Sequence, residues 1–262
     1  LSGGVIWIPD NHLMKKAGIA DSAKEALAYL QALTAGEVPL SKLAAYVKHG
    51  PEMVRYLEQK TLTRFNPAPE YADYYEQQPG YKRGARSLDS KPFSLRKLKQ
   101  YGNDIHPSSM RGIFGRINMT AIEAHKVLQS TTMRNFFILW RLLLHFLDVP
   151  YRLQGKRDNR LVLGQALVAS LRATMMQRDI PLWLNTGLDE LIVKKGRVCG
   201  VLATRNGKRI TIRARKGVIL ACGGFAKNAA LRQQYQQQPI SGDWSSANPC
   251  DMGDGIVAGQ KI

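Results

Sequence analysis

Two groups of residues in this sequence have the types and spacing that could support chemistry. The first lies in segment 216–228, where an apolar run from Val218 to Ala221 leads into Cys222 and the pair Gly223-Gly224. Glycines after a buried strand let a ligand or another chain segment approach the backbone, and open α/β folds bind ligands outside the carboxyl ends of strands. An ordinary strand-to-helix turn explains the same residues equally well.

The second group is a cluster of tyrosines in a stretch rich in proline and glycine. Tyr71, Tyr74 and Tyr75 are followed closely by Pro79-Gly80. A phenol combines an apolar ring with a polar tip and can serve in acid–base chemistry when it is suitably placed. By residue type alone, however, the simpler interpretation is an aromatic cluster that packs a loop onto the core.

The second half of the chain is predicted to supply strands. Residues 197–204 and 210–214 read as strands joined by Asn206-Gly207, the strongest short hairpin signal. Residues 181–184 and 218–221 read as short buried strands on either side of this hairpin. The glycine pair is therefore expected at the end of a buried strand.

The first half is predicted to be mainly helical. Ser22 and Glu25 form a capping signal for a helix over 23–33. A second helix is expected over 41–50, and Pro51 should open a third that runs to Lys60. Residues 61–104 read as a long loop region. Further helices are expected over 121–147 and 162–177, the latter with a packed face formed by Ala166, Leu167, Ser170 and Leu171.

Composition describes a globular but strongly basic chain. Its 262 residues are 44% hydrophobic, enough for one or two domains, and its formal net charge is +18. Such a charge either solubilises the surface or attracts an anion, such as a dinucleotide, a CoA ester, an acidic membrane surface or nucleic acid. The basic residues are scattered and no nucleic-acid-binding signature accompanies them, so nucleic acid is not an expected partner.

Cysteine usage points to a reducing, cytoplasmic location. Cys199, Cys222 and Cys250 are far apart and odd in number, so each is expected to be a small buried residue and not part of a disulfide. No signal peptide is recognisable. The histidines lack metal-ligand spacing, and no metal site is predicted.

The most hydrophobic run spans residues 136–147. Arg141 and His145 interrupt it, and it is too short to cross a bilayer. It predicts one buried helix, with a peripheral membrane contact as the alternative.

Several motifs, taken in order, resemble one flavoprotein family. Segment 2–11 resembles the Ser-Gly-Gly-x-x-Trp-x-Pro-x-Asn segment of the fumarate reductase and 3-oxosteroid dehydrogenase flavoproteins. Segment 71–74 resembles the Tyr-x-Asp-Tyr motif of the steroid enzymes, and segment 221–225 resembles the family's Ala-Thr-Gly-Gly-Phe strand end with Cys222 in place of threonine. Further similar segments are 163–168, 181–186, 246–249 and 253–256.

The resemblance implies an α/β fold with α+β character: an incomplete Rossmann-like FAD-binding domain with a β-meander and a helical insertion. Residues 1–20 would be the flavin-proximal segment, 21–180 the mainly helical region with its long loop 61–104, and 181–262 the β-meander and Gly-Gly strand end. The sequence contains no Gly-x-Gly-x-x-Gly. The chain is therefore expected to be the central part of a larger enzyme, without the glycine fingerprint and the substrate-capping domain.

The resemblance also implies the site residues. Tyr74 would be the partner of a catalytic tyrosine base, and Tyr71 a wall of the substrate pocket. The FAD contacts implied are Ser2, Gly3 and Gly4 near the flavin or pyrophosphate, Leu188 at the adenine, and Ala221, Cys222, Gly223, Gly224, Asp254 and Gly255 around the adenosine.

The implied function is FAD-dependent removal of the 1,2-hydrogens of a 3-ketosteroid A ring, with a separate electron acceptor as partner. Two alternatives remain open at this point. One is a fumarate-reductase-like flavoprotein that acts on another unsaturated substrate. The other is a non-catalytic fragment or basic binding module, which the missing glycine fingerprint favours.

Overall fold

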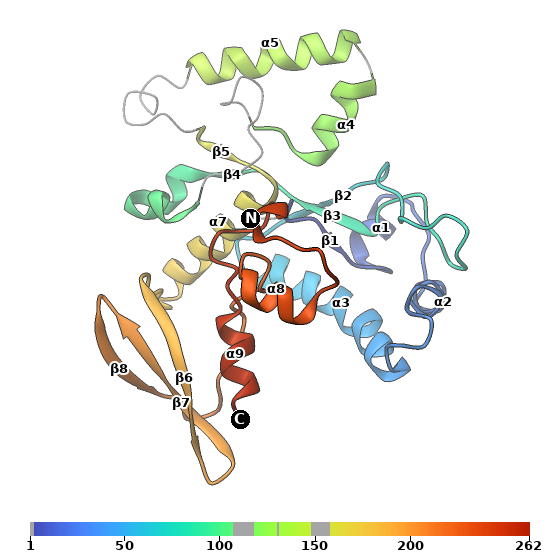
Figure 1. Cartoon of the computed structure of the whole chain (residues 1–262). Helices are drawn as coiled ribbons and strands as arrows, with labels where there is room; N and C mark the ends of the chain where they lie inside the picture. Colours follow the sequence, from blue (N-terminus) through green and yellow to red (C-terminus); the bar gives the residue numbers. More distant parts are fainter. Residues whose placement is uncertain (1–2, 107–117, 130, 148–157) are drawn as a thin grey trace. The chain divides into compact units, whose positions relative to one another are not determined.

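The computed structural model describes residues 3–106, 118–129, 131–147 and 158–262, and the chain divides into two compact units, Leu1–Ile180 and Pro181–Ile262. Figure 1 shows the elements along the chain.

The first unit begins with short β1 (Ile6–Trp7), α1 (His12–Lys16) and α2 (Ala23–Thr34). The predicted capping signal for α2 is confirmed: the Ser22 Oγ accepts a hydrogen bond from the Glu25 N–H at 3.2 Å and donates to the Glu25 carboxylate at 2.9 Å. The left-handed residue Ala35 ends the helix.

One helix, α3 (Leu40–Lys60), replaces the two helices predicted over this range. Pro51 lies inside it and is buried. The residue before a proline normally avoids the helical region because its Cβ meets the proline ring, but that residue is Gly50. A side chain at position 50 would also approach Ile8, at 3.3 Å. The missing Cβ therefore lets the helix continue through the proline and pack closely against Ile8, directly after β1.

The predicted loop 61–104 contains short elements in the structure. β2 (Phe65–Pro67) and β3 (Ser87–Ser90) form an antiparallel sheet with β1 in the order β1-β3-β2. β4 (Phe93–Ser94) pairs with β5 (Arg160–Leu161), and the 3₁₀ segment η1 spans Leu95–Asp104. Strands this short carry little periodicity, so the sequence offered no pattern from which to predict them.

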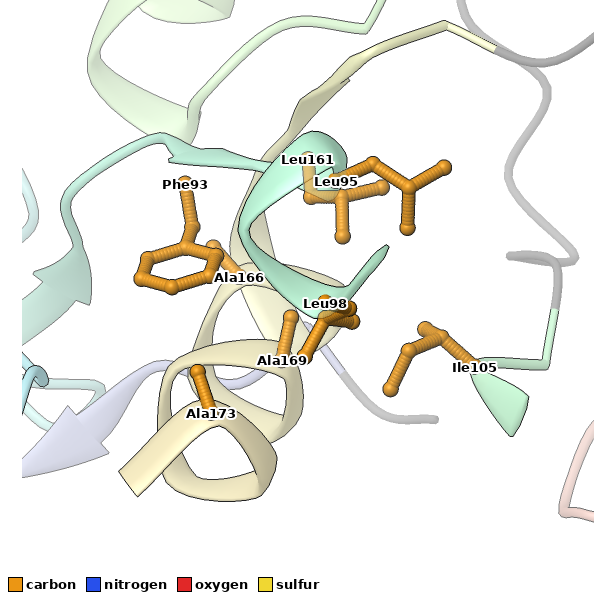
Figure 2. Packing of buried hydrophobic residues seen from close by; sticks show 8 residues of the cluster. All are labelled: Phe93, Leu95, Leu98, Ile105, Leu161, Ala166, Ala169 and Ala173. Carbon is orange, nitrogen blue, oxygen red and sulfur yellow. The ribbon is translucent and has the colours of Figure 1, made fainter. Parts of the chain in front are cut away.

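Helix α7 (Leu163–Gln177) organises a hydrophobic core of the first unit. Its small residues Ala166, Ala169 and Ala173 lie against larger side chains from β4, η1 and β5 (Figure 2). The predicted helix is confirmed. The cluster comprises Phe93, Leu95, Leu98, Ile105, Leu161, Ala166, Ala169 and Ala173.

The predicted helical stretch 121–147 is confirmed as α4 (Ala121–Gln129) and α5 (Thr131–Leu147). The prediction that the apolar run is buried is wrong. From residue 136 onward, the exposed side chains of α5 are apolar, with Phe136 65% and Leu139 67% exposed. Arg141, in contrast, is only 13% exposed and lies 3.9 Å from Asp158. No helix among the described residues is long and apolar enough to span a membrane.

The second unit contains a three-stranded meander of β6 (Thr186–Lys194), β7 (Arg197–Arg205) and β8 (Lys208–Arg213). The predicted hairpin is confirmed: Arg205 pairs with Lys208 across Asn206 and Gly207, and both turn residues have positive φ. Helices α8 (Ala229–Tyr235) and α9 (Asp254–Gln260) follow, with the 3₁₀ turn η2 (Gly242–Trp244) between them, and α9 packs on β6.

The two short strands predicted beside the meander are not strands in this structure. Residues 181–184 and 217–225 are extended or irregular, and among the described residues none pairs with them. Ile219 is 93% exposed. A strand needs a neighbouring strand to satisfy its backbone hydrogen bonds, and the meander uses its own consecutive segments for this purpose.

Candidate active site and cofactor segments

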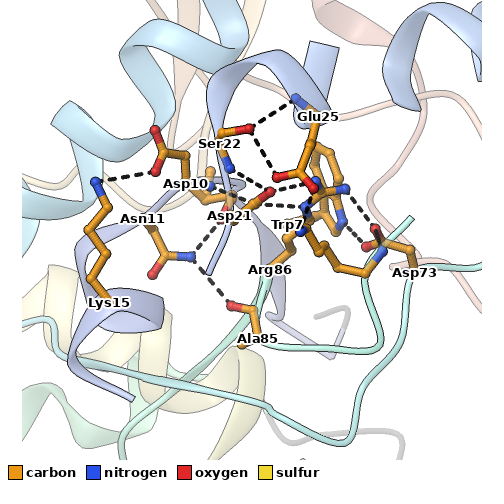
Figure 3. A network of polar contacts seen from close by, with 12 residues as sticks. Trp7, Asp10, Asn11, Lys15, Asp21, Ser22, Glu25, Asp73, Ala85 and Arg86 are labelled. Carbon is orange, nitrogen blue, oxygen red and sulfur yellow. Dashed lines mark hydrogen bonds and ion pairs between the residues drawn. The ribbon is translucent and has the colours of Figure 1, made fainter. Parts of the chain in front are cut away.

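A buried ion network lies between β1, α2 and β3 in the first unit. The guanidinium of Arg86 has no exposed surface and contacts two carboxylates (Figure 3). It donates to Asp21 through Nε at 2.8 Å and Nη2 at 2.7 Å, and to Asp73 through Nη1 at 2.8 Å. Burial raises the pKa of Asp21, but hydrogen bonds from Arg86 and from the Asp10 N–H outweigh it and hold that pKa below its usual range.

Asp73 fixes the tyrosine loop to this network. One carboxylate oxygen accepts from the indole of Trp7 at 2.6 Å, and the other accepts from Arg86 and from the Lys82 N–H at 3.1 Å. The Asp73 N–H in turn donates to the Lys82 carbonyl at 3.0 Å. The Tyr75 N–H donates to the Tyr29 hydroxyl at 3.2 Å. Loop 71–82 is therefore held at several points by buried groups.

An aromatic cavity of about 240 Å³ opens beside the loop. Trp7 and Tyr29 come from β1 and α2, while Tyr71, Asp73 and Tyr74 come from the loop. The other lining residues are Val5, Leu30, Leu33, Ala72, Tyr75 and Ser87. This cavity has apolar walls and phenol groups at its edge, which suits a flat apolar molecule with a polar end.

The two tyrosines of the predicted site are brought together. The hydroxyls of Tyr71 and Tyr74 lie 3.2 Å apart. The hydrogen bond to Tyr74 raises the pKa of Tyr71, and burial of the phenol is the second cause of this increase. Tyr74 is 81% exposed, so the interpretation that these tyrosines only pack a loop onto the core does not describe it.

A second cavity, of about 460 Å³, has Tyr71 as a lining residue in common with the first. It lies between segment 68–71 and α4, and most of its lining residues are apolar: Ala68, Pro69, Ala121, Ile122 and Ala124. Glu70 and His125 add polar groups, with 3.9 Å between the carboxylate oxygen and the imidazole Nε2. Tyr71 thus lines both cavities.

Ser2 lies outside the described residues, but the neighbouring glycines have distinct environments. Gly4 is buried with φ +68°, and a Cβ there would lie 2.4 Å from the backbone of Gly164 at the start of α7. Gly3 is exposed, with no atom within 4 Å of the position of a Cβ. The exposed backbone at Gly3 fits the predicted approach of a cofactor, whereas Gly4 is required by packing against α7.

The predicted adenosine contacts of the second unit fall into two groups. Leu188 lies in β6, paired with Ala203 and partly buried. Ala221, Cys222, Gly223 and Gly224 are exposed, and Gly224 has no atom within 4 Å of a Cβ position. An open glycine backbone of this kind fits a nucleotide that approaches the main chain.

Asp254 and Gly255 begin α9, and Gly255 lies against the glycine segment. A Cβ at Gly255 would be 3.3 Å from the Cys222 Sγ, and one at Gly223 would be 2.8 Å from the Asp251 carboxylate. The structure therefore brings Gly255 next to Cys222, which is compatible with the predicted shared site. The prediction that the cysteines are buried is wrong, since Cys222 and Cys250 are exposed and Cys199 is partly buried; all three are free.

Sequence reasoning did not find the residues that hold the tyrosine loop. Asp73 lies inside the Tyr-Ala-Asp-Tyr motif, so the motif was a signal for it. Arg86 and Asp21 carry no comparable signal, because each looks like one more charged residue in a basic chain. Their 65-residue separation means that only tertiary structure reveals the pair.

The chain belongs to the family of FAD binding domains, whose model matches residues 1–261. The match confirms the predicted flavoprotein family and the predicted FAD cofactor.

Several steroid dehydrogenases are similar to this chain. The chain is 37% identical to the 3-oxosteroid 1-dehydrogenase of Comamonas testosteroni over 99% of its length, and 35% identical to that of Mycolicibacterium smegmatis over its full length. It also matches the crystal structure of 3-ketosteroid delta1-dehydrogenase from Sterolibacterium denitrificans in complex with 1,4-androstadiene-3,17-dione, with a TM-score of 0.95 and 36% identity over 100% of this chain.

These similarities confirm the predicted resemblance to the steroid enzymes and the predicted fold class. The chain spans about half the length of these relatives: 46% of both curated proteins and 47% of the solved chain.

Proposed function

We propose that this chain is part of an FAD-dependent 3-oxosteroid 1-dehydrogenase that removes the 1,2-hydrogens from the A ring of a 3-ketosteroid. The observation that carries the proposal is the Tyr71–Tyr74 hydroxyl pair at the edge of the aromatic cavity, in a chain whose relatives carry that activity in their names. These relatives favour the steroid activity over a fumarate-reductase type.

The reaction needs an acceptor for a proton and an acceptor for a hydride. The hydrogen on C2 is acidic because it lies next to the ketone, and it leaves as a proton to a base. Bound FAD supplies the acceptor for the hydride that leaves C1. In this division, Tyr74 passes on the proton as partner to the base, and Tyr71 orients the Tyr74 hydroxyl through their 3.2 Å contact.

The cavities suit a substrate of this class. A steroid is flat and apolar with polar groups only at its ends, and the cavity that contains Trp7 and Tyr29 has apolar aromatic walls. We assign the reacting ring to the neighbourhood of Tyr74. The second cavity, which Tyr71 also lines, provides further apolar surface for the remote part of the molecule.

The function is tested by incubating the purified chain with FAD, removing free cofactor, and assaying 1,2-dehydrogenation of a 3-ketosteroid with an artificial electron acceptor. Tyr74→Phe should lower kcat by about 10²-fold or more, the usual contribution of a positioned proton-transfer group. Tyr56→Phe is the matched control, because Tyr56 is an exposed tyrosine of α3 that lines neither cavity. A Tyr74→Phe variant with unchanged kcat would remove Tyr74 from the reaction, and turnover of fumarate but not steroid would favour the alternative activity.

We propose a cytoplasmic location with a peripheral membrane contact through α5. From residue 136 onward the exposed side chains of this helix are apolar, and they include Phe136, Leu139, Trp140, Leu143 and Phe146. Arg141 and His145 lie on the opposite, partly buried face. The helix contains no acidic residue and the chain carries a net charge of +18, so anionic lipid is the complementary surface.

Sedimentation with phosphatidylserine-containing vesicles tests this contact. The wild-type chain should co-sediment with the vesicles. The double variant Leu139→Glu, Leu143→Glu should not, since each substitution places a charge on the apolar face. Leu182→Glu is the control, because Leu182 is an exposed leucine of the second unit. Equal binding by wild type and the double variant would exclude α5 as the lipid contact.

A further inference from the structure

We propose that Asp73 is a positioning residue that fixes the Tyr71–Tyr74 pair to the amino-terminal segment carrying Gly3 and Gly4. The catalytic consequence rests on the function proposed for Tyr74, whereas the positioning itself is a property of this chain and can be tested without turnover.

Among residues 71–75, Asp73 is the one whose side chain has a described contact with Arg86. The flanking tyrosines Tyr71 and Tyr74 point their hydroxyls at each other beside the cavity. Asp73 turns inward, and its residue is 8% exposed, against 40% for Tyr71 and 81% for Tyr74. One buried carboxylate therefore anchors a loop whose two phenols remain accessible.

The network that receives Asp73 is itself held rigidly. Arg86 forms a bidentate pair with Asp21, whose carboxylate also accepts from the Asp10 N–H and the Ser22 N–H, each at 2.9 Å. The guanidinium carbon lies 5.4 Å from the ring centroid of Trp7 and 5.6 Å from that of Tyr29. A planar guanidinium held by three hydrogen bonds to two carboxylates has little freedom to follow a moving loop.

Trp7 connects Asp73 to the segment predicted to lie near the flavin. It lies three residues after Gly4, pairs with Ser87 in the β1–β3 ladder and accepts a hydrogen bond at its carbonyl from Tyr46. Its indole N–H donates to Asp73 at 2.6 Å. The carboxylate of Asp73 thus links the glycine segment to the tyrosine pair through a single hydrogen bond and a short stretch of strand.

An amide cannot replace this carboxylate. Both oxygens of Asp73 face donors: Trp7 on one side, Arg86 and the Lys82 N–H on the other. In Asp73→Asn, one side must present an NH₂ group to an N–H, so one anchor is lost whichever way the amide turns. We expect the loop to loosen and the Tyr71–Tyr74 contact to break.

Asp21→Asn is the matched comparison. Asp21 binds the same arginine, and its side chain is 1% exposed against 2% for Asp73. Like those of Asp73, its carboxylate oxygens face only hydrogen-bond donors. The two variants should lower thermal stability by similar amounts. Because Asp21 makes no contact with loop 71–82 among the described hydrogen bonds, only Asp73→Asn should release the tyrosines directly.

The test is nitration with tetranitromethane, followed by peptide mass spectrometry that reports Tyr71 and Tyr74 separately. Nitration follows the phenolate, and the hydrogen bond to Tyr74 raises the pKa of Tyr71. In Asp73→Asn, Tyr71 should therefore be nitrated at a lower pH than in wild type, while in Asp21→Asn its pH profile should stay near that of wild type. Trp7→Phe, which removes only the indole donor, should shift the profile in the same direction, and serves if Asp73→Asn does not fold.

Kinetics supply the second measurement. Where the wild-type chain turns over steroid, Asp73→Asn should lower kcat by about 10²-fold with KM nearly unchanged, the effect expected of a displacement near 1 Å. The proposal would be overturned if the nitration profile shifted equally in Asp73→Asn and Asp21→Asn. It would also be overturned if the profile shifted in neither Asp73→Asn nor Trp7→Phe. Absence of FAD binding and turnover in wild type would count against the proposed function, while the nitration result would still decide the positioning role.

Discussion

The loop carrying Tyr71 and Tyr74 and the segment carrying Gly223 and Gly224 differ in how the chain holds them. The loop is anchored by buried charges and hydrogen bonds to β1, α2 and β3, more than 60 residues away in the case of Trp7. The glycine segment is exposed, with Ile219 93% accessible and no pairing strand among the described residues. The first region is thus anchored by contacts within this chain, whereas the second presents an open backbone.

The difference shows which kinds of local order this chain can produce from its own contacts. A loop becomes ordered when a few side chains reach a buried partner, and here Asp73 and Arg86 are enough. An extended apolar segment becomes a strand only beside another strand, because its backbone groups need partners along the whole edge. The meander obtains those partners locally, through β6, β7 and β8.

The largest effect is expected from Arg86→Met, which leaves the carboxylates of Asp21 and Asp73 buried without their cation. Removing one partner of a buried ion pair costs about 3–5 kcal/mol. Urea unfolding combined with hydrogen exchange over residues 71–90 measures the loss. Lys15→Met is the control, because the Lys15–Asp10 pair is 63% and 27% exposed and should contribute at most about 1 kcal/mol. Similar losses in both variants would mean that the loop is not anchored by this network.

Gly200→Ala should have the next largest effect, in the region that depends on strand pairing. A Cβ at this position of β7 would lie 2.4 Å from the Ile212 carbonyl oxygen in β8, so the two strands must separate at a cost of about 1–3 kcal/mol. Gly187→Ala in β6 is the matched control, since no atom lies within 4 Å of its Cβ position. Amide exchange along β7 and β8 reports the difference, and equal protection in both variants would contradict the strand contact.

Ser22→Ala tests a smaller contribution, next to the ion network. It removes the side-chain cap of α2, worth about 1 kcal/mol, and frees Glu25, which also pairs with Lys82 at 2.7 Å. Thermal unfolding should show a lower Tm, with little change for Thr34→Ala at the other end of the helix. If the two alanine variants lower Tm equally, the cap does not help to support the loop.

Gly224→Ala should have the smallest effect on stability and should act mainly on FAD affinity. No atom of the chain lies within 4 Å of the new Cβ, so the free energy of unfolding should stay within about 0.5 kcal/mol of wild type. FAD affinity, measured by fluorescence titration, should fall if the nucleotide approaches this backbone. Unchanged affinity together with unchanged stability would show that the exposed glycine contacts neither the chain nor the cofactor.

The sequence by itself determined the features whose partners are close along the chain. Ser22 and Glu25 gave the start of α2, Asn206-Gly207 gave the hairpin, and short motifs gave the flavoprotein family and the tyrosine pair. The helix cap and the hairpin depend on hydrogen bonds and backbone angles within a few residues, and the family was read from short motifs, so the residue types alone were sufficient.

Tertiary structure decided the rest, because the physical causes lie far apart in the sequence. Pro51 stays inside α3 because Gly50 has no Cβ and packs near Ile8, and the apolar residues of α5 are exposed although their hydropathy predicted burial. Arg86 joins Asp21 and Asp73 only when β3, α2 and the tyrosine loop meet. In residues 217–225, the apolar composition favours a strand, but the segment can form one only if a neighbouring strand pairs with its backbone.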